Sequence, residues 1–124
     1  QNTLAPAAGT ASALTTIGMA GGAYTSETIN GTPQTVYNFP FGAGLRFAAP
    51  AALDDYSIVA LIRLDQTSGW RRIMDVSNRT SDRGLYFYQG YLQFYPFLTG
   101  TTFTGPNTWV EVALTRPSGG AVHW

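Results

Sequence analysis

The stretch from Asp55 to Tyr95 alternates β-prone runs with short polar turns, and this rhythm constrains the fold more than any other feature of the chain. Its turns lie at Gln66–Trp70, Ser77–Arg83 and Gln89–Gly90, where Gly, Asn, Asp and Ser are frequent. Four β-prone runs separated by such turns predict an antiparallel sheet assembled from neighbouring hairpins. No residues typical of an enzyme occur in this stretch.

The pattern before this stretch is weaker. Gln1–Gly22 is rich in Ala, Thr and Gly, and we expect it to form an extended arm or a weak first strand. Two β-prone runs follow, Tyr24–Ile29 and Thr35–Phe39, on either side of a turn at Asn30–Pro33. We predict that residues 1–43 belong to the same domain as the main β-sandwich region, which spans residues 44–124.

Within residues 44–124 the alternation of apolar and polar residues becomes regular. A short strand starts at Leu45 and ends before Pro50. The next strand, Tyr56–Asp65, has apolar residues at the centre of both faces, which predicts that both faces are covered. Trp109–Thr115 alternates again, with the apolar side chains of Val110, Val112 and Leu114 on one face. Since no segment has a sustained helical period, the predicted class is all-β.

Charge and composition narrow the classes of partner. Only 11% of the residues are charged and the formal net charge is zero. Nucleic acids and anionic membrane surfaces require clustered positive charge, so neither is expected as a partner. No run of apolar residues is long enough for a transmembrane helix, and no membrane insertion is expected.

The compartment is predicted from several weak signals. The chain has no cysteine and no lysine, is rich in Thr and Gly, and begins at Gln1 without an initiator Met, as a mature chain after signal-peptide removal would. Together these features favour an extracellular or cell-surface protein. Asn30 and Asn78 each start an Asn-x-Thr sequon, which matters only in a host that glycosylates asparagine.

Four segments, in order, carry a resemblance to a known family: Tyr56–Asp65, Gly69–Asn78, Ser81–Tyr95 and Trp109–Arg116. Together they resemble a laminin-G-like domain of the concanavalin A-like lectin/glucanase superfamily, of the bacterial secreted type. The resemblance covers about residue 44 to the end and implies a two-sheet antiparallel jelly-roll sandwich. In that family further strands follow the position of Ala121–Trp124. We therefore expect an incomplete sandwich with an open sheet edge, through which copies could pair into a homo-oligomer or polymer.

Catalysis is not expected. Glycoside hydrolases of this superfamily use two carboxylates about 5–9.5 Å apart, whereas Glu27 and Glu111 are far apart in sequence and in unlike contexts. His123, the one histidine, has no cysteine partner in the chain and lies one residue from its end.

Calcium is the ion that the resemblance implies, since laminin-G-like domains often hold one Ca²⁺ at the rim of the sandwich. No cofactor is required otherwise. Carboxylate and amide oxygens suit this ion, and the candidate ligands are Asp54, Asp55, Asp75, Asn78 and Asp82. The alternative is that these are turn residues whose side chains bond to their own backbone.

Aromatic residues make up 14% of the chain and crowd one predicted hairpin. Exposed rings stack on sugars and anchor protein interfaces, so the candidate ligand-binding residues are Trp70, Arg71, Arg72, Tyr86, Tyr88, Tyr91 and Tyr95. The alternative for the rings is packing within the sheet. The two arginines could instead pair with Asp75 or Asp82.

The leading functional prediction is a secreted, non-catalytic recognition or adhesion module that binds a glycan or an extracellular protein. The alternative is a structural subunit of an extracellular fibre or surface layer, assembled by strand pairing between copies.

Overall fold

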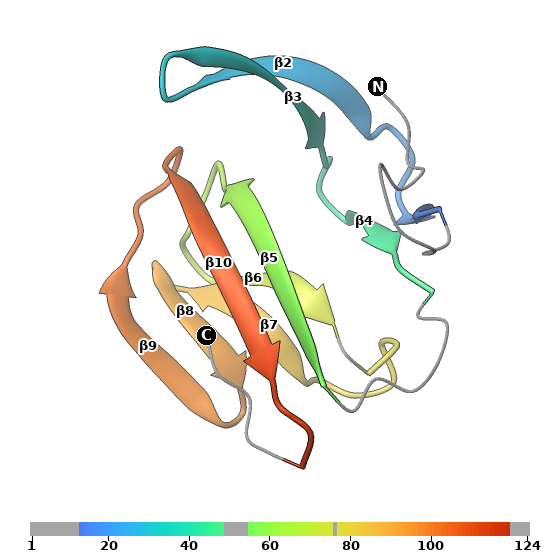
Figure 1. Ribbon diagram of the computed structural model, residues 1–124, viewed down its shortest axis with the longest axis vertical. Helices are drawn as coiled ribbons and strands as arrows, with labels where there is room; N and C mark the ends of the chain where they lie inside the picture. The colour runs from blue at the N-terminus through green and yellow to red at the C-terminus, as the bar shows by residue number, and fades with distance from the viewer. Residues whose placement is uncertain (1–12, 49–54, 76, 120–124) are drawn as a thin grey trace. The chain divides into compact units, whose positions relative to one another are not determined.

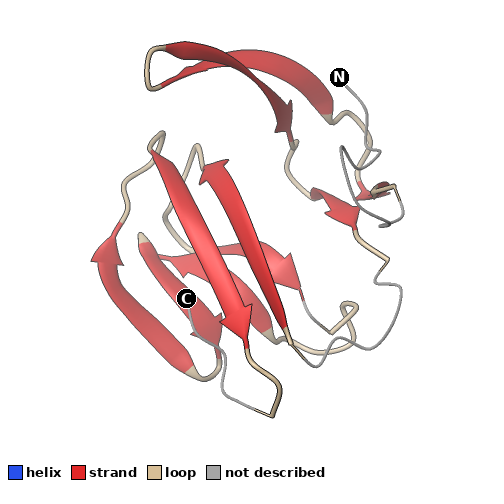
Figure 2. Ribbon diagram, in the orientation of Figure 1, coloured by secondary structure: helices blue, strands red, loops and turns tan. Residues whose placement is uncertain are grey.

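A computed structural model of the protein describes residues 13–48, 55–75 and 77–119, which form ten strands and no helix (Figures 1 and 2). The all-β prediction is confirmed for this part of the chain. No helix capable of crossing a membrane is found among these residues. The strands are β1 Thr15–Gly18, β2 Ala23–Ile29, β3 Thr32–Asn38, β4 Ala43–Arg46, β5 Tyr56–Arg63, β6 Trp70–Asp75, β7 Gly84–Tyr88, β8 Tyr91–Tyr95, β9 Leu98–Phe103 and β10 Trp109–Arg116.

The chain divides into two compact units. Of the described residues, unit 1 contains 13–48, 55–56 and 117–119, and unit 2 contains 57–75 and 77–116. Unit 1 therefore holds β1 to β4, and unit 2 holds β5 to β10 apart from the first residue of β5.

Unit 1 is built from two antiparallel pairs, β1 with β4 and β2 with β3. The first confirms a weak early strand, at Thr15–Gly18; residues 1–12 lie outside the described residues. The turn between β2 and β3 is shorter than predicted. Asn30 and Gly31 both have positive φ, of 50° and 78°, which a two-residue hairpin turn requires. The strand therefore resumes at Thr32 and includes Pro33, because a two-stranded ribbon tolerates a residue without an N–H on its outer edge.

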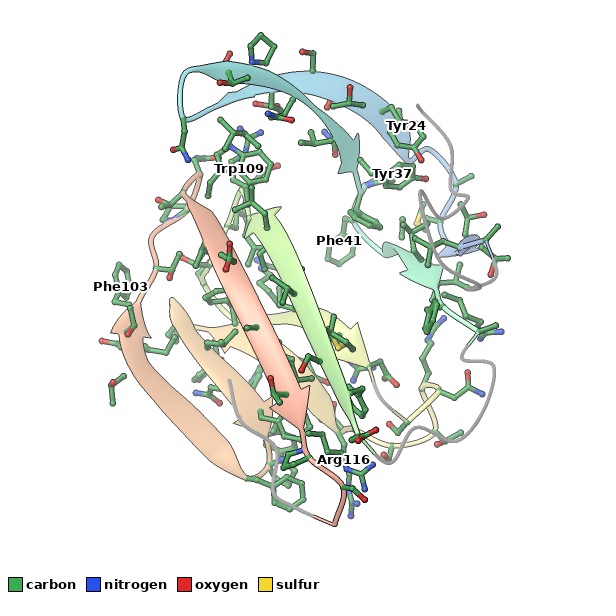
Figure 3. The ribbon with its side chains drawn as sticks, viewed as in Figure 1. Tyr24, Tyr37, Phe41, Phe103, Trp109 and Arg116 are labelled. Carbon is green, nitrogen blue, oxygen red and sulfur yellow. The ribbon has the colours of Figure 1, made fainter. Side chains whose placement is uncertain are left out.

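Unit 2 contains a four-stranded antiparallel sheet in the order β6-β7-β8-β9, and a separate pair of β5 with β10. The prediction of successive hairpins is thus confirmed for β6 to β8 but wrong for β5, whose partner comes from the far end of the chain. Ser57 Oγ lies 3.3 Å from Thr115 Oγ1, and Arg63 lies over the Trp109 ring at 5.1 Å. These contacts join opposite ends of the two strands, as in an antiparallel pair (Figures 1 and 3).

The core of unit 2 lies between its two layers. In Figure 1 the β5–β10 pair crosses in front of the four-stranded sheet. The nearly inaccessible apolar side chains are Leu85, Phe87 and Phe94 of the sheet and Val112 and Leu114 of β10. This gives unit 2 a sandwich-like arrangement and confirms the predicted alternation of β10. The prediction that both faces of β5 are covered is wrong, because Val59 and Leu61 are exposed.

One end of the sheet is fixed by the turn between β7 and β8. Gln89 and Gly90 have positive φ, of 52° and 83°, as in a tight hairpin turn. The Gly90 N–H donates to the Thr67 carbonyl at 3.0 Å, and the Gly90 carbonyl accepts from the Thr104 N–H at 2.7 Å. The Phe103 ring lies so close to Gly90 that a Cβ at this position would overlap it. These contacts tie the turn to the end of β9 and to the loop before β6.

Candidate functional site: an aromatic face

A row of aromatic residues crosses all four strands of the β6–β9 sheet. Trp70 is the direct cross-strand partner of Tyr88, Tyr88 of Tyr91, and Tyr91 of Phe103. Directly opposed residues in a sheet project from the same face, so the four side chains share one face. We call Trp70, Tyr88, Tyr91 and Phe103 the aromatic row.

Two pairs of rings in the row are in contact. Trp70 stacks on Tyr88 with centroids 4.2 Å apart and planes 24° apart, and Tyr91 meets Phe103 edge to face at 5.6 Å. Trp70 also meets Tyr86 at 5.5 Å and Tyr95 at 5.4 Å, both edge to face. Such contacts hold the rings in defined positions.

The row is accessible. Trp70 is 48% exposed and Phe103 60%, while Tyr91 and Tyr95 are also exposed and Tyr88 is half-buried. Leu85 and Phe87 alternate with Tyr86 and Tyr88 along β7 and are buried on the opposite face. The aromatic face is therefore the outer face of the sheet. Figure 3 shows Phe103 at the end of β9.

A polar group, the Arg72 cluster, lies beside the row and consists of Arg72, Asp75, Asp82 and Tyr86. Arg72 donates from Nη1 to Asp75 Oδ2 at 2.8 Å and from Nη2 to Asp82 Oδ1 at 2.7 Å. Its Nε donates to the Tyr86 hydroxyl at 2.6 Å, and that hydroxyl donates to Asp82 at 2.6 Å. The guanidinium also lies 5.1 Å from the Tyr86 ring centroid. With one cation and two carboxylates, the cluster has a net charge of −1.

Three members of the cluster have shifted pKa values. For Arg72, burial acts to lower the pKa, but the hydrogen bond and charge of Tyr86 and the carboxylates of Asp75 and Asp82 outweigh it, so the pKa of Arg72 is raised. Burial raises the pKa of Tyr86, and its hydrogen bond to Asp82 raises it further. For Asp75, burial acts to raise the pKa. The hydrogen bonds from the amides of Arg79 and Ser77 and the charge of Arg72 outweigh burial, so the pKa of Asp75 lies below 3.8. Those amides donate to Asp75 Oδ1 at 3.0 and 2.9 Å. Asp75 therefore stabilises the turn after β6 and also fixes the position of the Arg72 guanidinium.

Six of the seven predicted ligand-binding residues come together on this face: Trp70, Arg72, Tyr86, Tyr88, Tyr91 and Tyr95. Tyr86 is 5% exposed and serves as a support beneath Trp70. Arg71 is the exception. It pairs with Phe87 in the register, which places it on the opposite face, and its Nη2 donates to Gln66 Oε1 at 2.8 Å.

The sequence interpretation missed Phe103 and Gln93. Gln93 is the cross-strand partner of Tyr86 and so lies on the aromatic face. Phe103 was missed because β9 was not predicted: its sequence, Leu-Thr-Gly-Thr-Thr-Phe, lacks apolar alternation. The signal that could have found it is the clustering of β-branched threonines before an aromatic residue.

The predicted calcium ligands that the structure describes are divided between the turn after β6 and the start of β5. Asp75 and Asp82 both face Arg72, while Asn78 lies in the turn with a φ of 51°. Asp55 directly precedes β5, and Asp54 lies outside the described residues. Across residues 13–48, 55–75 and 77–119, no set of three His, Cys, Asp or Glu side chains could hold a metal. Asp75 bonds to its own turn, as in the alternative interpretation, and calcium binding stays a prediction.

The residues considered for catalysis are placed as follows. Glu111 lies on the exposed side of β10 in unit 2, Glu27 lies in β2 of unit 1, and His123 is outside the described residues. That the protein is not an enzyme stays a prediction.

Comparison with protein families, with curated proteins and with solved structures found no match to this chain.

Proposed function

We propose that the protein is a secreted, non-catalytic recognition module that binds glycan through the aromatic row. The observation that carries this proposal is the row itself, in which each strand of the sheet supplies one aromatic residue to the same accessible face. Aromatic rings offer large apolar surfaces that lose little conformational entropy on binding. The C–H faces of pyranose rings stack on such surfaces.

We further propose that unit 2 is a laminin-G-like domain with a jelly-roll sandwich, and that it acts outside the cell or on its surface. The sandwich-like packing of the β5–β10 pair on the β6–β9 sheet supports the architecture. The four segments that resemble this family fall on β5, β6, β7 with β8, and β10. Low charge and the absence of cysteine and lysine support the location.

Glycan binding is tested by titrating the purified protein with a panel of soluble oligosaccharides in a calorimeter. We expect binding to at least one sugar and at least about tenfold weaker binding by Trp70→Ala, because hot-spot aromatic residues dominate interface energies. Phe97→Ala is the matched control, since Phe97 is 61% exposed but stacks on Phe94 of the opposite face. Equal loss in both variants, or no binding to any sugar, contradicts the proposal.

A second candidate function is a structural subunit assembled by strand pairing between copies. One observation favours it: among the described strands, β5 and β10 pair only with each other, which leaves both outer edges open. Val59 and Leu61 are exposed on the same pair. Sedimentation velocity over a wide concentration range tests this. Growth of polymers that disappears in Val59→Thr/Leu61→Thr supports assembly, and a constant monomer mass contradicts it.

A further inference from the structure

We infer that the ligand of the aromatic row is an uncharged, linear oligosaccharide that lies across the four strands and contacts the row with several sugar units. This inference rests on the proposed function and adds the class, charge and orientation of the ligand. Three observations lead to it: the continuity of the row across the sheet, the neutralisation of its only cation, and the composition of the face.

The first observation concerns the length of the aromatic row and its direction across the sheet. The four members of the row are consecutive direct cross-strand partners, so they follow the hydrogen-bonding direction of the sheet. Neighbouring strands lie about 4.8 Å apart, which makes the row roughly 14 Å long from β6 to β9. One pyranose ring covers only part of that length. An extended chain of several units covers all of it.

The second observation concerns the charge of the aromatic face. Arg72 is the only basic residue among the residues that the register places on this face, and it binds both Asp75 and Asp82. The positive charge is thus more than balanced, and an anionic sugar meets a net charge of −1. Arg71 lies on the other face with Gln66, and Arg83 lies over the Phe97 ring at 5.8 Å. Recognition of carboxylate or sulfate groups requires cationic donors that are free to pair with them.

The third observation concerns the side chains themselves. The register places aromatic rings on this face together with the amide of Gln93 and the hydroxyl of its partner Thr99. The tyrosines add further hydroxyl groups, and none of the paired residues on this face is aliphatic. A protein partner is usually met by a mixed aromatic and aliphatic core. Rings bordered by hydroxyl and amide groups instead match a ligand that alternates C–H faces with hydroxyls.

The test compares binding of sugars that differ in the number of units and in charge. The probes are cellohexaose, xylohexaose and mannohexaose, their monosaccharides, and hexagalacturonate as the acidic hexamer. We expect at least one neutral hexamer to bind at least about tenfold more tightly than its monosaccharide, because each stacked unit adds contact area. Its affinity should not change between about 0.05 and about 0.5 M NaCl, since no ion pair forms. Hexagalacturonate should not bind.

Variants at the two ends of the row test its orientation. Trp70→Ala and Phe103→Ala should each weaken hexamer binding at least about tenfold, with Trp70→Tyr restoring most of the loss because it retains a ring. Phe103→Ala should affect the hexamer more than the disaccharide of the same sugar, since a short ligand does not reach both ends. Phe97→Ala, with nearly the same exposure as Phe103 (61% against 60%), should leave both affinities unchanged. Thermal unfolding of each variant verifies that it is folded.

The outcomes separate this inference from the proposed function. A monosaccharide that binds as tightly as the hexamer, or salt-sensitive binding of hexagalacturonate, overturns the inference and leaves glycan recognition standing. A hexamer affinity that depends on Trp70 but not on Phe103 overturns the orientation across the strands. Failure of every sugar to bind overturns both the inference and the proposed function.

Discussion

At the scale of single residues, Asp75 uses both oxygens of its carboxylate to join two parts of the site. One carboxylate oxygen accepts from the amides of Ser77 and Arg79, and the other accepts from Arg72. The first set closes the turn after β6, and the second holds the guanidinium against the Tyr86 ring. Asp75 therefore couples a turn conformation to the support beneath Trp70.

This coupling gives a pH dependence with a definite sign. The pKa of Asp75 lies below 3.8 in the folded protein, so the folded state favours the ionised form. Its contribution to the free energy of unfolding is complete above about pH 5 and disappears as the pH falls below 3.8 and through the folded-state value. Asp75→Asn should lower the stability by about 1 kcal/mol at neutral pH, and the two proteins should converge in acid.

Urea unfolding at a series of pH values measures this difference. Asp65→Asn is the control, because Asp65 is exposed and makes no ion pair with any described residue. A difference between the wild type and Asp75→Asn that is the same at neutral and acidic pH would show that the Asp75 charge is not involved.

At the scale of elements, the hairpin of β7 and β8 aligns the row. Tyr88 and Tyr91 flank the two turn residues, so the conformation of Gln89 and Gly90 determines their register. Any other residue at Gly90 has to adopt a φ of 83° and place a Cβ within the Phe103 ring. The turn, Phe103 and the end of the row therefore depend on one another.

Gly90→Ala should destabilise the protein by about 2 kcal/mol or more, of which about 1 kcal/mol is the backbone cost of a positive φ. Gly69→Ala separates the two contributions, because Gly69 has a φ of 65° but has no atoms within 4 Å of its Cβ position. Chemical denaturation of both variants gives the comparison. Equal losses in the two variants would mean that the Phe103 ring moves aside without cost.

The sequence predicted the hairpin strands of this sheet well and the partner of β5 badly. Period-two alternation and Gly-containing turns are local signals, and they located β6, β7, β8 and β10 within one or two residues. The pairing of β5 with β10 joins residues that are far apart in the chain, and nothing in either strand alone encodes it. For the site, the sequence supplied Trp70 and the tyrosines. It could not reveal that they align, because alignment depends on the register of three strand pairs.

At the scale of the whole molecule, burial is distributed unevenly. Every described residue that is almost completely buried belongs to unit 2, including Thr67, Leu85, Phe87, Phe94 and Leu114. Among residues 13–48 of unit 1, side chains are half-buried or exposed. Two-stranded sheets without a core are only marginally stable by themselves in water.

Amide hydrogen exchange should therefore be faster in β1 to β4 than in β7, β8 and β10. Exchange from strands that lack buried apolar contacts requires only local opening, whereas exchange from the core of unit 2 requires global unfolding. Exchange followed by mass spectrometry at the peptide level measures the contrast. Equal protection of both units would show that they unfold as a single cooperative body.

The stacked pair of Trp70 and Tyr88 also gives the protein an intrinsic spectroscopic signal for binding. Two aromatic chromophores held 4.2 Å apart with planes 24° apart couple their electronic transitions, so the pair gives the folded chain a distinct near-ultraviolet circular dichroism band. Trp109 lies at the start of another strand, under Arg63, and does not share this environment. The band should vanish in Trp70→Ala and change whenever a molecule settles on the row, so occupancy can be read without any label.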